Sequence, residues 1–77
     1  MIQVLFFAHL QDEIGENQVA MDIDSLTVKE LKERIRETYA VSQMDSTMVS
    51  VNEEFAKDDQ LIQQGDEVAF IPPISGG

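Results

Sequence analysis

The fold is decided by the closing stretch EVAFIPPISGG, residues 67–77. Branched and aromatic side chains dominate its first five positions, a composition that is typical of a β-strand. Pro72 and Pro73 follow, and because proline has no N–H to donate to a sheet, the strand ends before them. The sequence therefore predicts a last strand at 67–71 and an extended tail at 72–77.

Working back from this strand, branched or alternating apolar residues predict three more strands. They lie at 2–8, 19–23 and 48–51, and the last of these is followed by a tight turn at 52–54. A polar connection at 57–64 then leads into the final strand.

The segment 26–39 has the clearest helical pattern in the chain. Thr27 and Glu30 have the spacing of a capping box, in which each side chain bonds the other residue's backbone N–H. Apolar residues recur every three or four positions and form one stripe, made of Val28, Leu31, Ile35 and Tyr39. A single helical turn is expected at 9–14, stopped by Gly15. This order of elements predicts an α+β domain with one main helix packed across a mixed sheet.

Length and charge narrow the possible classes of function. The chain has 77 residues and a formal net charge of −10. Such a chain forms one domain with one thin core, with little room for an enclosed catalytic pocket. The negative charge repels nucleic acid and anionic lipid, so we expect neither nucleic acid nor a membrane as partner. A basic protein surface is the natural complement.

The numbers of cysteine and histidine residues and the length of the apolar runs argue against several kinds of site and against a membrane span. The sequence has no cysteine and one histidine, which argues against disulfides, thiolate chemistry and a conventional metal site, so we predict no metal. The longest apolar run, residues 4–8, is far shorter than a membrane span. We expect a soluble, cytoplasmic protein.

The tail at 72–77 is the one break in composition. Six extended residues reach about 20 Å, enough to carry a terminal carboxylate clear of the domain. Gly76 and Gly77 have no Cβ, so a narrow channel can admit them. A carboxylate at Gly77 is ionised at neutral pH and unreactive until activated. Adenylation would make it an acyl donor, and an incoming sulfur would then give a thiocarboxylate. The alternative is a frayed glycine end without a function.

The two ends of the chain, taken together, resemble the MoaD family of ubiquitin-like sulfur carriers, the small subunits of molybdopterin synthase. The residues that carry the resemblance are the opening IQVLFFA at 2–8, the pair Val51-Asn52, and the closing stretch 65–77. The resemblance implies a β-grasp fold in which the first and last strands are parallel neighbours. It also implies a division into a β-grasp domain at 1–71 and a tail at 72–77.

Strand pairing of this kind predicts which face each side chain occupies. If Val4, Phe6, Val68 and Phe70 face the helix, then Leu5, Phe7, Ala69 and Ile71 emerge on the opposite face. Phe7, Ile71 and Phe55 would then form an exposed apolar patch beside the tail, which we interpret as a partner-binding surface. The alternative is a few scattered exposed hydrophobic residues, which are common.

The resemblance implies a function centred on Gly77. An ATP-dependent activating enzyme would adenylate its carboxylate, and a sulfur donor protein would replace the adenylate to leave a thiocarboxylate. Ile74, Ser75 and Gly76 would insert with Gly77 into the large synthase subunit. There the sulfur would attack cyclic pyranopterin monophosphate, and two deliveries would build the molybdopterin dithiolene.

The resemblance also implies which partners the chain binds and whether it holds a cofactor. The partners would be the large subunit, in a heterotetramer of two small and two large subunits, the activating enzyme and the sulfur donor. No cofactor would be bound, since the adenylate and thiocarboxylate are transient modifications. Most catalytic side chains would belong to the partners, so the chain would be a non-catalytic sulfur-donor subunit.

Two other classes of function remain open on the sequence alone. One is a related thiocarboxylate carrier for thiazole or cysteine synthesis, although the Phe6-Phe7 pair and the FIPP segment at 70–73 favour the molybdopterin carrier. The other is a ubiquitin-like protein modifier, whose tail would form isopeptide bonds with lysines, or a plain adaptor with an inactive tail.

The remaining polar features favour ordinary structural roles. His9 has no identifiable orienting partner in the sequence and is interpreted as a surface residue. The adjacent acidic pairs lack the spacing of glycosidase or calcium sites and are interpreted as solvated loop charge. Met21, Met44 and Met48 are expected to fill the core or its edge.

Overall fold

The computed structural model of this chain describes residues 1–41 and 44–72, and the side chains of all of these except His9 and Asp45. Its elements in chain order are β1 (Ile2–Phe6), α1 (His9–Ile14), β2 (Gln18–Met21), β3 (Ser25–Thr27), α2 (Val28–Tyr39), the 3-10 turn η1 (Met44–Ser46), β4 (Met48–Val51), β5 (Glu54–Ala56), β6 (Leu61–Gln63) and β7 (Glu67–Ile71).

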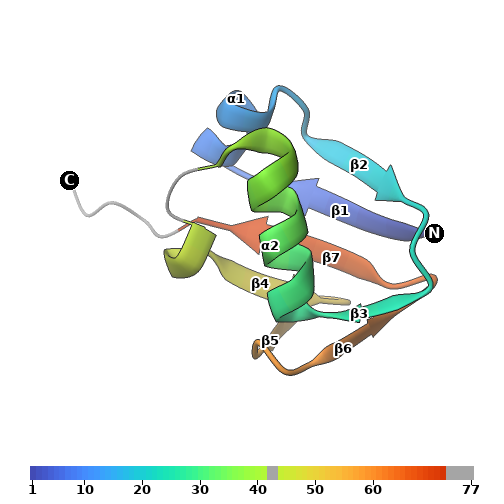
Figure 1. Cartoon of the computed structure of the whole chain (residues 1–77). Helices are drawn as coiled ribbons and strands as arrows, with labels where there is room; N and C mark the ends of the chain where they lie inside the picture. The colour runs from blue at the N-terminus through green and yellow to red at the C-terminus, as the bar shows by residue number, and fades with distance from the viewer. Residues whose placement is uncertain (42–43, 73–77) are drawn as a thin grey trace.

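A five-stranded mixed sheet forms the centre of the molecule. Its strand order is β2-β1-β7-β4-β5, and β3 and β6 form a separate two-stranded sheet. β1 and β7, the first and last strands, are parallel neighbours, whereas the other pairs are antiparallel. α2 crosses one face of the large sheet (Figure 1). The predicted α+β fold, with one main helix across a mixed sheet, is confirmed.

The core lies between α2 and the face of the sheet that it covers. β1 and β7 each alternate buried with half-buried residues, so Val4, Phe6, Val68 and Phe70 are all buried, as predicted. They meet the buried stripe of α2, formed by Val28, Leu31 and Ile35. The Phe6 ring packs edge-on against Phe70, with ring centres 5.7 Å apart. The aromatic rings and branched side chains therefore join the two central strands to the helix.

The predicted capping box fixes the start of α2. Glu30 N donates to Thr27 Oγ1 over 3.2 Å, and Thr27 N donates to Glu30 Oε1 over 2.9 Å. These bonds satisfy backbone N–H groups that have no partner inside the helix. The helix begins at Val28, two residues later than the predicted segment, because Leu26 belongs to β3 and pairs with Ile62 of β6.

Two short strands lie outside the predicted elements. β6 occupies part of the expected polar connection at 57–64, where Ile62 is fully buried between exposed Leu61 and Gln63. β5 carries Phe55 directly after the predicted turn and pairs with β4. Each has three residues, too few for a hydrophobic period to identify a strand.

Two further predictions of strand ends and one burial prediction are wrong. β1 ends at Phe6 because Ala8, with φ 54°, turns the chain toward α1. β2 ends at Met21, and the backbone bends there as Ile23 N donates to Met21 O. Met44 is buried as predicted, but Met48 is 49% exposed, because its neighbour in β4, Val49, takes the core side.

Candidate functional site

The face of the sheet opposite α2 carries side chains that none of the described helices covers; we call it the open face. Strand register determines its members. Leu5 and Ser50 both lie opposite Ala69, Phe55 lies opposite Ser50, and Met48 lies opposite Ile71. Because side chains alternate between faces along a strand, these residues all project to the same side.

A hollow of about 320 Å³ lies on the open face. Its apolar lining comes from three strands, β1, β5 and β7, and from the residue after β1, and its polar lining comes from β4, β7 and the turn between β4 and β5. The apolar residues are Leu5, Phe7, Phe55, Ala69 and Ile71, and the polar residues are Ser50, Glu53 and Glu67. Phe55 is 69% exposed and Phe7 is 44% exposed. The structure thus brings together Phe7, Phe55 and Ile71, and their partner-binding role stays a prediction.

Met48 extends this apolar surface, although the sequence predicted it in the core or at its edge. Its exposure of 49% and its register opposite Ile71 place it on the open face. The alternation of side chains along β4 could have identified the position of Met48. Val49 and Val51 face the helix, so Met48 and Ser50 project to the other side. That inference needs the pairing of β4 with β7, which composition does not supply.

Hydrogen bonds join the turn between β4 and β5 to the start of β7. Asn52 Nδ2 donates to Asp66 Oδ1 over 3.1 Å, and Asn52 Oδ1 accepts from Glu67 N over 3.0 Å. The backbone adds a bond from Asn52 N to Glu67 O at 2.8 Å. Asp66 Oδ2 in turn accepts from Gln63 N over 2.8 Å. This network holds the hairpin that carries Glu53 and Phe55 against the strand that leads to the tail.

The tail itself falls almost entirely outside the described residues. Ile74, Ser75, Gly76 and Gly77, the predicted inserting and reacting residues, have no described placement. Pro72 is buried and follows directly on Ile71, which lines the hollow on the open face. The chain therefore enters the predicted tail from the edge of the apolar patch.

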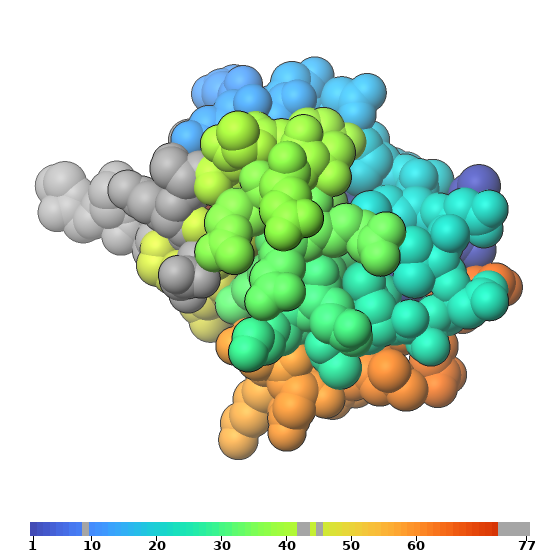
Figure 2. Space-filling view, viewed as in Figure 1, coloured from blue at the N-terminus to red at the C-terminus, as the bar shows by residue number. Residues whose placement is uncertain are grey.

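The helix-covered side of the molecule has a different charge. Figure 2 shows this side, with the side chains of α2 in green across its middle. Four of the five cationic residues of the sequence lie on α2: Lys29, Lys32, Arg34 and Arg36. The fifth, Lys57, follows β5. The positive charge of an otherwise acidic chain is thus gathered mainly on the helix.

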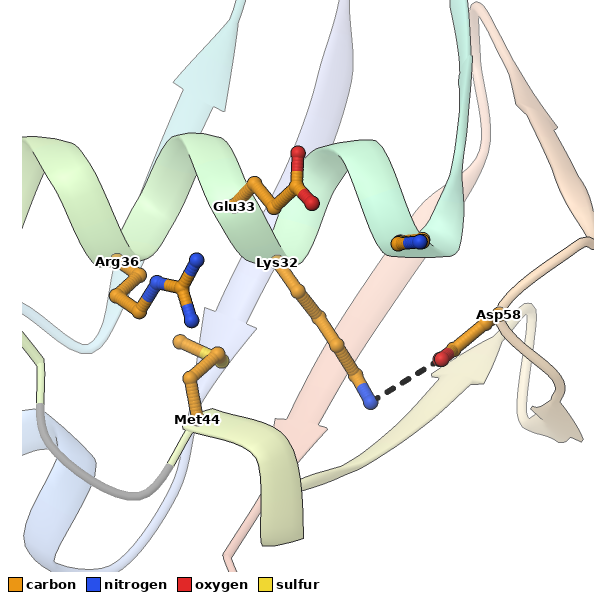
Figure 3. Close-up of a pocket in the computed structure, with 6 residues that line it drawn as sticks. Lys32, Glu33, Arg36, Met44 and Asp58 are labelled. Carbon is orange, nitrogen blue, oxygen red and sulfur yellow. Dashed lines mark hydrogen bonds and ion pairs between the residues drawn. The ribbon is translucent and has the colours of Figure 1, made fainter.

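A cavity of about 240 Å³ lies beside α2 (Figure 3). Its lining combines basic, acidic and apolar side chains, namely Lys29, Lys32, Glu33, Arg36, Met44 and Asp58. Lys32 Nζ lies 3.3 Å from Asp58 Oδ1, an ion pair that joins the helix to the segment between β5 and β6. We interpret the cavity as a gap beside this structural contact.

The Glu30 carboxylate, at the start of α2, has a shifted pKa. The pKa of Glu30 is lowered, chiefly by the hydrogen bond from the Thr27 backbone and then by the Thr27 side chain. This carboxylate belongs to the helix cap. Among residues 1–41 and 44–72, with His9 and Asp45 set aside, no three acidic or histidine side chains are grouped to hold a metal ion. The described helices are all too short or too polar to cross a membrane.

Comparison with known proteins places these features in a family. The model of the ThiS family matches residues 4–77, nearly the whole chain. This chain belongs to the ThiS family. The molybdopterin synthase sulfur carrier subunit of Escherichia coli is 33% identical over 81 aligned residues, which cover 100% of both chains.

Solved structures share the fold of this ThiS-family chain. SAMP1 from Haloferax volcanii has a TM-score of 0.80 and 26% identity, with 99% of this chain and 98% of that chain covered. A chain in the complex of subunits 1 and 2 of molybdopterin-converting factor from Helicobacter pylori has a TM-score of 0.69 and 20% identity, with 99% and 97% covered. The β-grasp arrangement implied by the resemblance is confirmed.

Proposed function

We propose that this chain is the sulfur carrier subunit of a molybdopterin synthase. The observation that carries the proposal is the alignment of the sequence from end to end with a sulfur carrier subunit of that name. The apolar open face, where Ile71 lines the hollow, and the Gly-Gly pair at 76–77 support it. The face provides a docking surface, and the end provides a carboxylate without side-chain obstruction.

The chemistry would take place at the carboxyl carbon of Gly77. Its carboxylate attacks the α-phosphorus of ATP on an activating enzyme, and pyrophosphate leaves. A persulfide on the sulfur donor displaces AMP and forms a C–S bond, and a thiol then cleaves the acyl disulfide to free the thiocarboxylate. Activation is needed because an ionised carboxylate is a poor electrophile.

Delivery would follow by docking of the open face on the large subunit. Phe7, Phe55 and Ile71 bind that subunit, while Ile74, Ser75 and Gly76 carry the Gly77 sulfur into its active site. In each delivery the sulfur attacks a carbon of cyclic pyranopterin monophosphate and displaces an oxygen substituent from it, and water then cleaves the Gly77 C–S bond, which leaves the sulfur on the pterin and restores the Gly77 carboxylate. Two deliveries complete the dithiolene of molybdopterin. A heterotetramer of two small and two large subunits would present two such tails.

Mass spectrometry of the intact chain tests the carrier step. Incubation with the cognate activating enzyme, ATP and a sulfur donor should exchange one oxygen for one sulfur. The matched control is the chain lacking Gly77, which should show no exchange while keeping its thermal stability. An unchanged mass for the full chain, with an activating enzyme that is active on another carrier, would contradict the proposal.

A protein modifier is the second candidate, supported by the similarity to SAMP1, which the Haloferax volcanii structures describe as small archaeal modifier protein 1. In that case Gly77 would form isopeptide bonds with lysines of target proteins. Conjugates that carry this chain in an extract of its own host, and that vanish when Gly77 is deleted, would support the modifier. Molybdopterin formation from the thiocarboxylated chain and the large subunit would support the carrier.

A further inference from the structure

The hollow on the open face has carboxylates on its rim. Glu53 and Glu67 line it, together with apolar residues and Ser50. No lysine or arginine contributes to this lining. Four cations lie on α2, which covers the other face of the sheet (Figure 1). The open face therefore combines apolar surface with negative charge, and the opposite side holds most of the positive charge.

The position of Glu53 carries a conformational cost. Its φ is 71°, and that of Asn52 is 52°, so both residues of this two-residue hairpin turn adopt left-handed backbone angles. Asn followed by Gly is the usual pair for such a turn, because glycine meets no steric penalty there. A glutamate at the second position is strained, and the bonds from Asn52 to Asp66 and Glu67 hold the turn in place. Residues with strained backbone angles of this kind concentrate at functional sites.

The two glutamates belong to segments that are hydrogen-bonded to each other. Asn52 precedes Glu53 and accepts a hydrogen bond from Glu67 N. Glu53 and Glu67 therefore stand on elements that are fastened together, beside the exposed ring of Phe55. A long cationic side chain fits such a surface, because its apolar stem can pack on a ring while its head pairs with carboxylates.

We infer that Glu53 and Glu67 form an acidic clamp that receives a lysine or arginine of the large synthase subunit, with the stem of that side chain packed on Phe55. This inference rests on the proposed function and adds the chemistry of the partner surface. Apolar contact on the open face supplies affinity, and the clamp fixes which partner binds and how it is oriented.

Calorimetry with the purified large subunit tests the clamp. The double variant Glu53→Gln/Glu67→Gln should bind about ten-fold more weakly at low salt, because it removes both charges from the interface. The difference should shrink as salt rises from about 50 to about 500 mM, since salt screens charge pairs. The matched control is Glu33→Gln/Glu37→Gln on exposed positions of α2, which makes the same change of net charge on the other side of the sheet and should bind like the wild type.

Equal weakening by the double variant and its control would assign the effect to net charge and overturn the clamp. Unchanged affinity and salt dependence in the double variant would overturn it as well. A second variant, Glu53→Gly, separates binding from folding, because glycine relieves the strain at φ 71°. Its melting temperature should rise by a few degrees while its affinity falls several-fold. An unchanged affinity in this variant would contradict the clamp.

Failure of the clamp and failure of the proposed function give different results. If Phe55→Ala weakens binding but the double glutamine variant does not, the open face is the docking surface and the clamp is wrong. If the wild-type chain does not bind the large subunit at all, the proposed function and the clamp are both wrong.

Discussion

The two faces of the central sheet differ in what covers them and in charge. On β7, Phe70 is fully buried beneath α2, whereas its neighbour Ile71 lines the hollow on the open face. On β1, Phe6 is buried and Phe7, the next residue, is 44% exposed. A shift of one residue thus separates a side chain that stabilises the domain from one available to a partner. One face of the sheet thus carries the core, and we propose that the other face binds the partner.

The largest expected effect is on the helix-covered face. Phe70→Ala removes a fully buried ring that packs on Phe6. It should lower the free energy of unfolding by about 3 to 5 kcal/mol, through lost burial and the cavity left behind. Urea denaturation followed by circular dichroism measures this. A loss below about 1 kcal/mol would show that this face does not carry the stability.

Asn52→Ala tests the connection between the hairpin and β7. It removes the acceptor of Glu67 N and the donor to Asp66, at a residue whose φ of 52° disfavours alanine. We expect a loss of about 1 to 3 kcal/mol in the free energy of unfolding. Asn52→Asp keeps the acceptor of Glu67 N and should lose less. Equal losses in the two variants would assign the cost to the bond with Asp66, which both variants lack, and not to the Glu67 bond.

Ile71→Asp sharpens the contrast on the open face. It should weaken binding to the large subunit by about 1 to 3 kcal/mol or more, because the new carboxylate would be buried without a partner in the complex. Phe55→Ala should weaken binding within the same range and change the free energy of unfolding by only about 0.5 kcal/mol, since the ring is 69% exposed in the free chain. Calorimetry measures binding. Wild-type affinity in both variants would contradict the docking role of this face.

The smallest expected effect is a pH dependence at the start of α2. Hydrogen bonds from Thr27 lower the pKa of Glu30 below its ordinary value of about 4.3. A lowered folded-state pKa means that this carboxylate stabilises the fold fully above its ordinary pKa and loses that contribution as pH falls through the folded value. The stability difference between wild type and Glu30→Gln should therefore shrink in acid. If the difference in the free energy of unfolding between the two proteins stays constant through the acid range, the helix cap does not lower the pKa of Glu30.

Local patterns in the sequence predicted the helix and its cap. Thr27 and Glu30 lie three residues apart, so their bonds can be inferred without knowledge of the rest of the fold. The parallel pairing of β1 with β7 could not be inferred in this way. Both strands alternate apolar side chains, but alternation does not say which strands are neighbours, and the resemblance supplied that information.

The open face was predicted only in part, because its members depend on which strands are neighbours. Phe7 and Ile71 were assigned to the open face from the alternation of side chains, once the first and last strands were paired. Both residues line the hollow. Met48 was expected in the core or at its edge because methionine commonly fills cores, and only the register with Ile71 puts it on the open face. The Asn52 turn was predicted from the backbone tolerance of asparagine, but its bonds to Asp66 and Glu67 depend on residues far along the chain.

Reconstitution with the large subunit tests the central claim most directly. The chain, verified by mass as a thiocarboxylate at Gly77, would be mixed with the large subunit and cyclic pyranopterin monophosphate, and molybdopterin would be measured by its fluorescent oxidation product. The account predicts molybdopterin from the wild type and a large reduction from an equally thiolated and folded Ile71→Asp chain. A verified wild-type thiocarboxylate that yields no molybdopterin would contradict it.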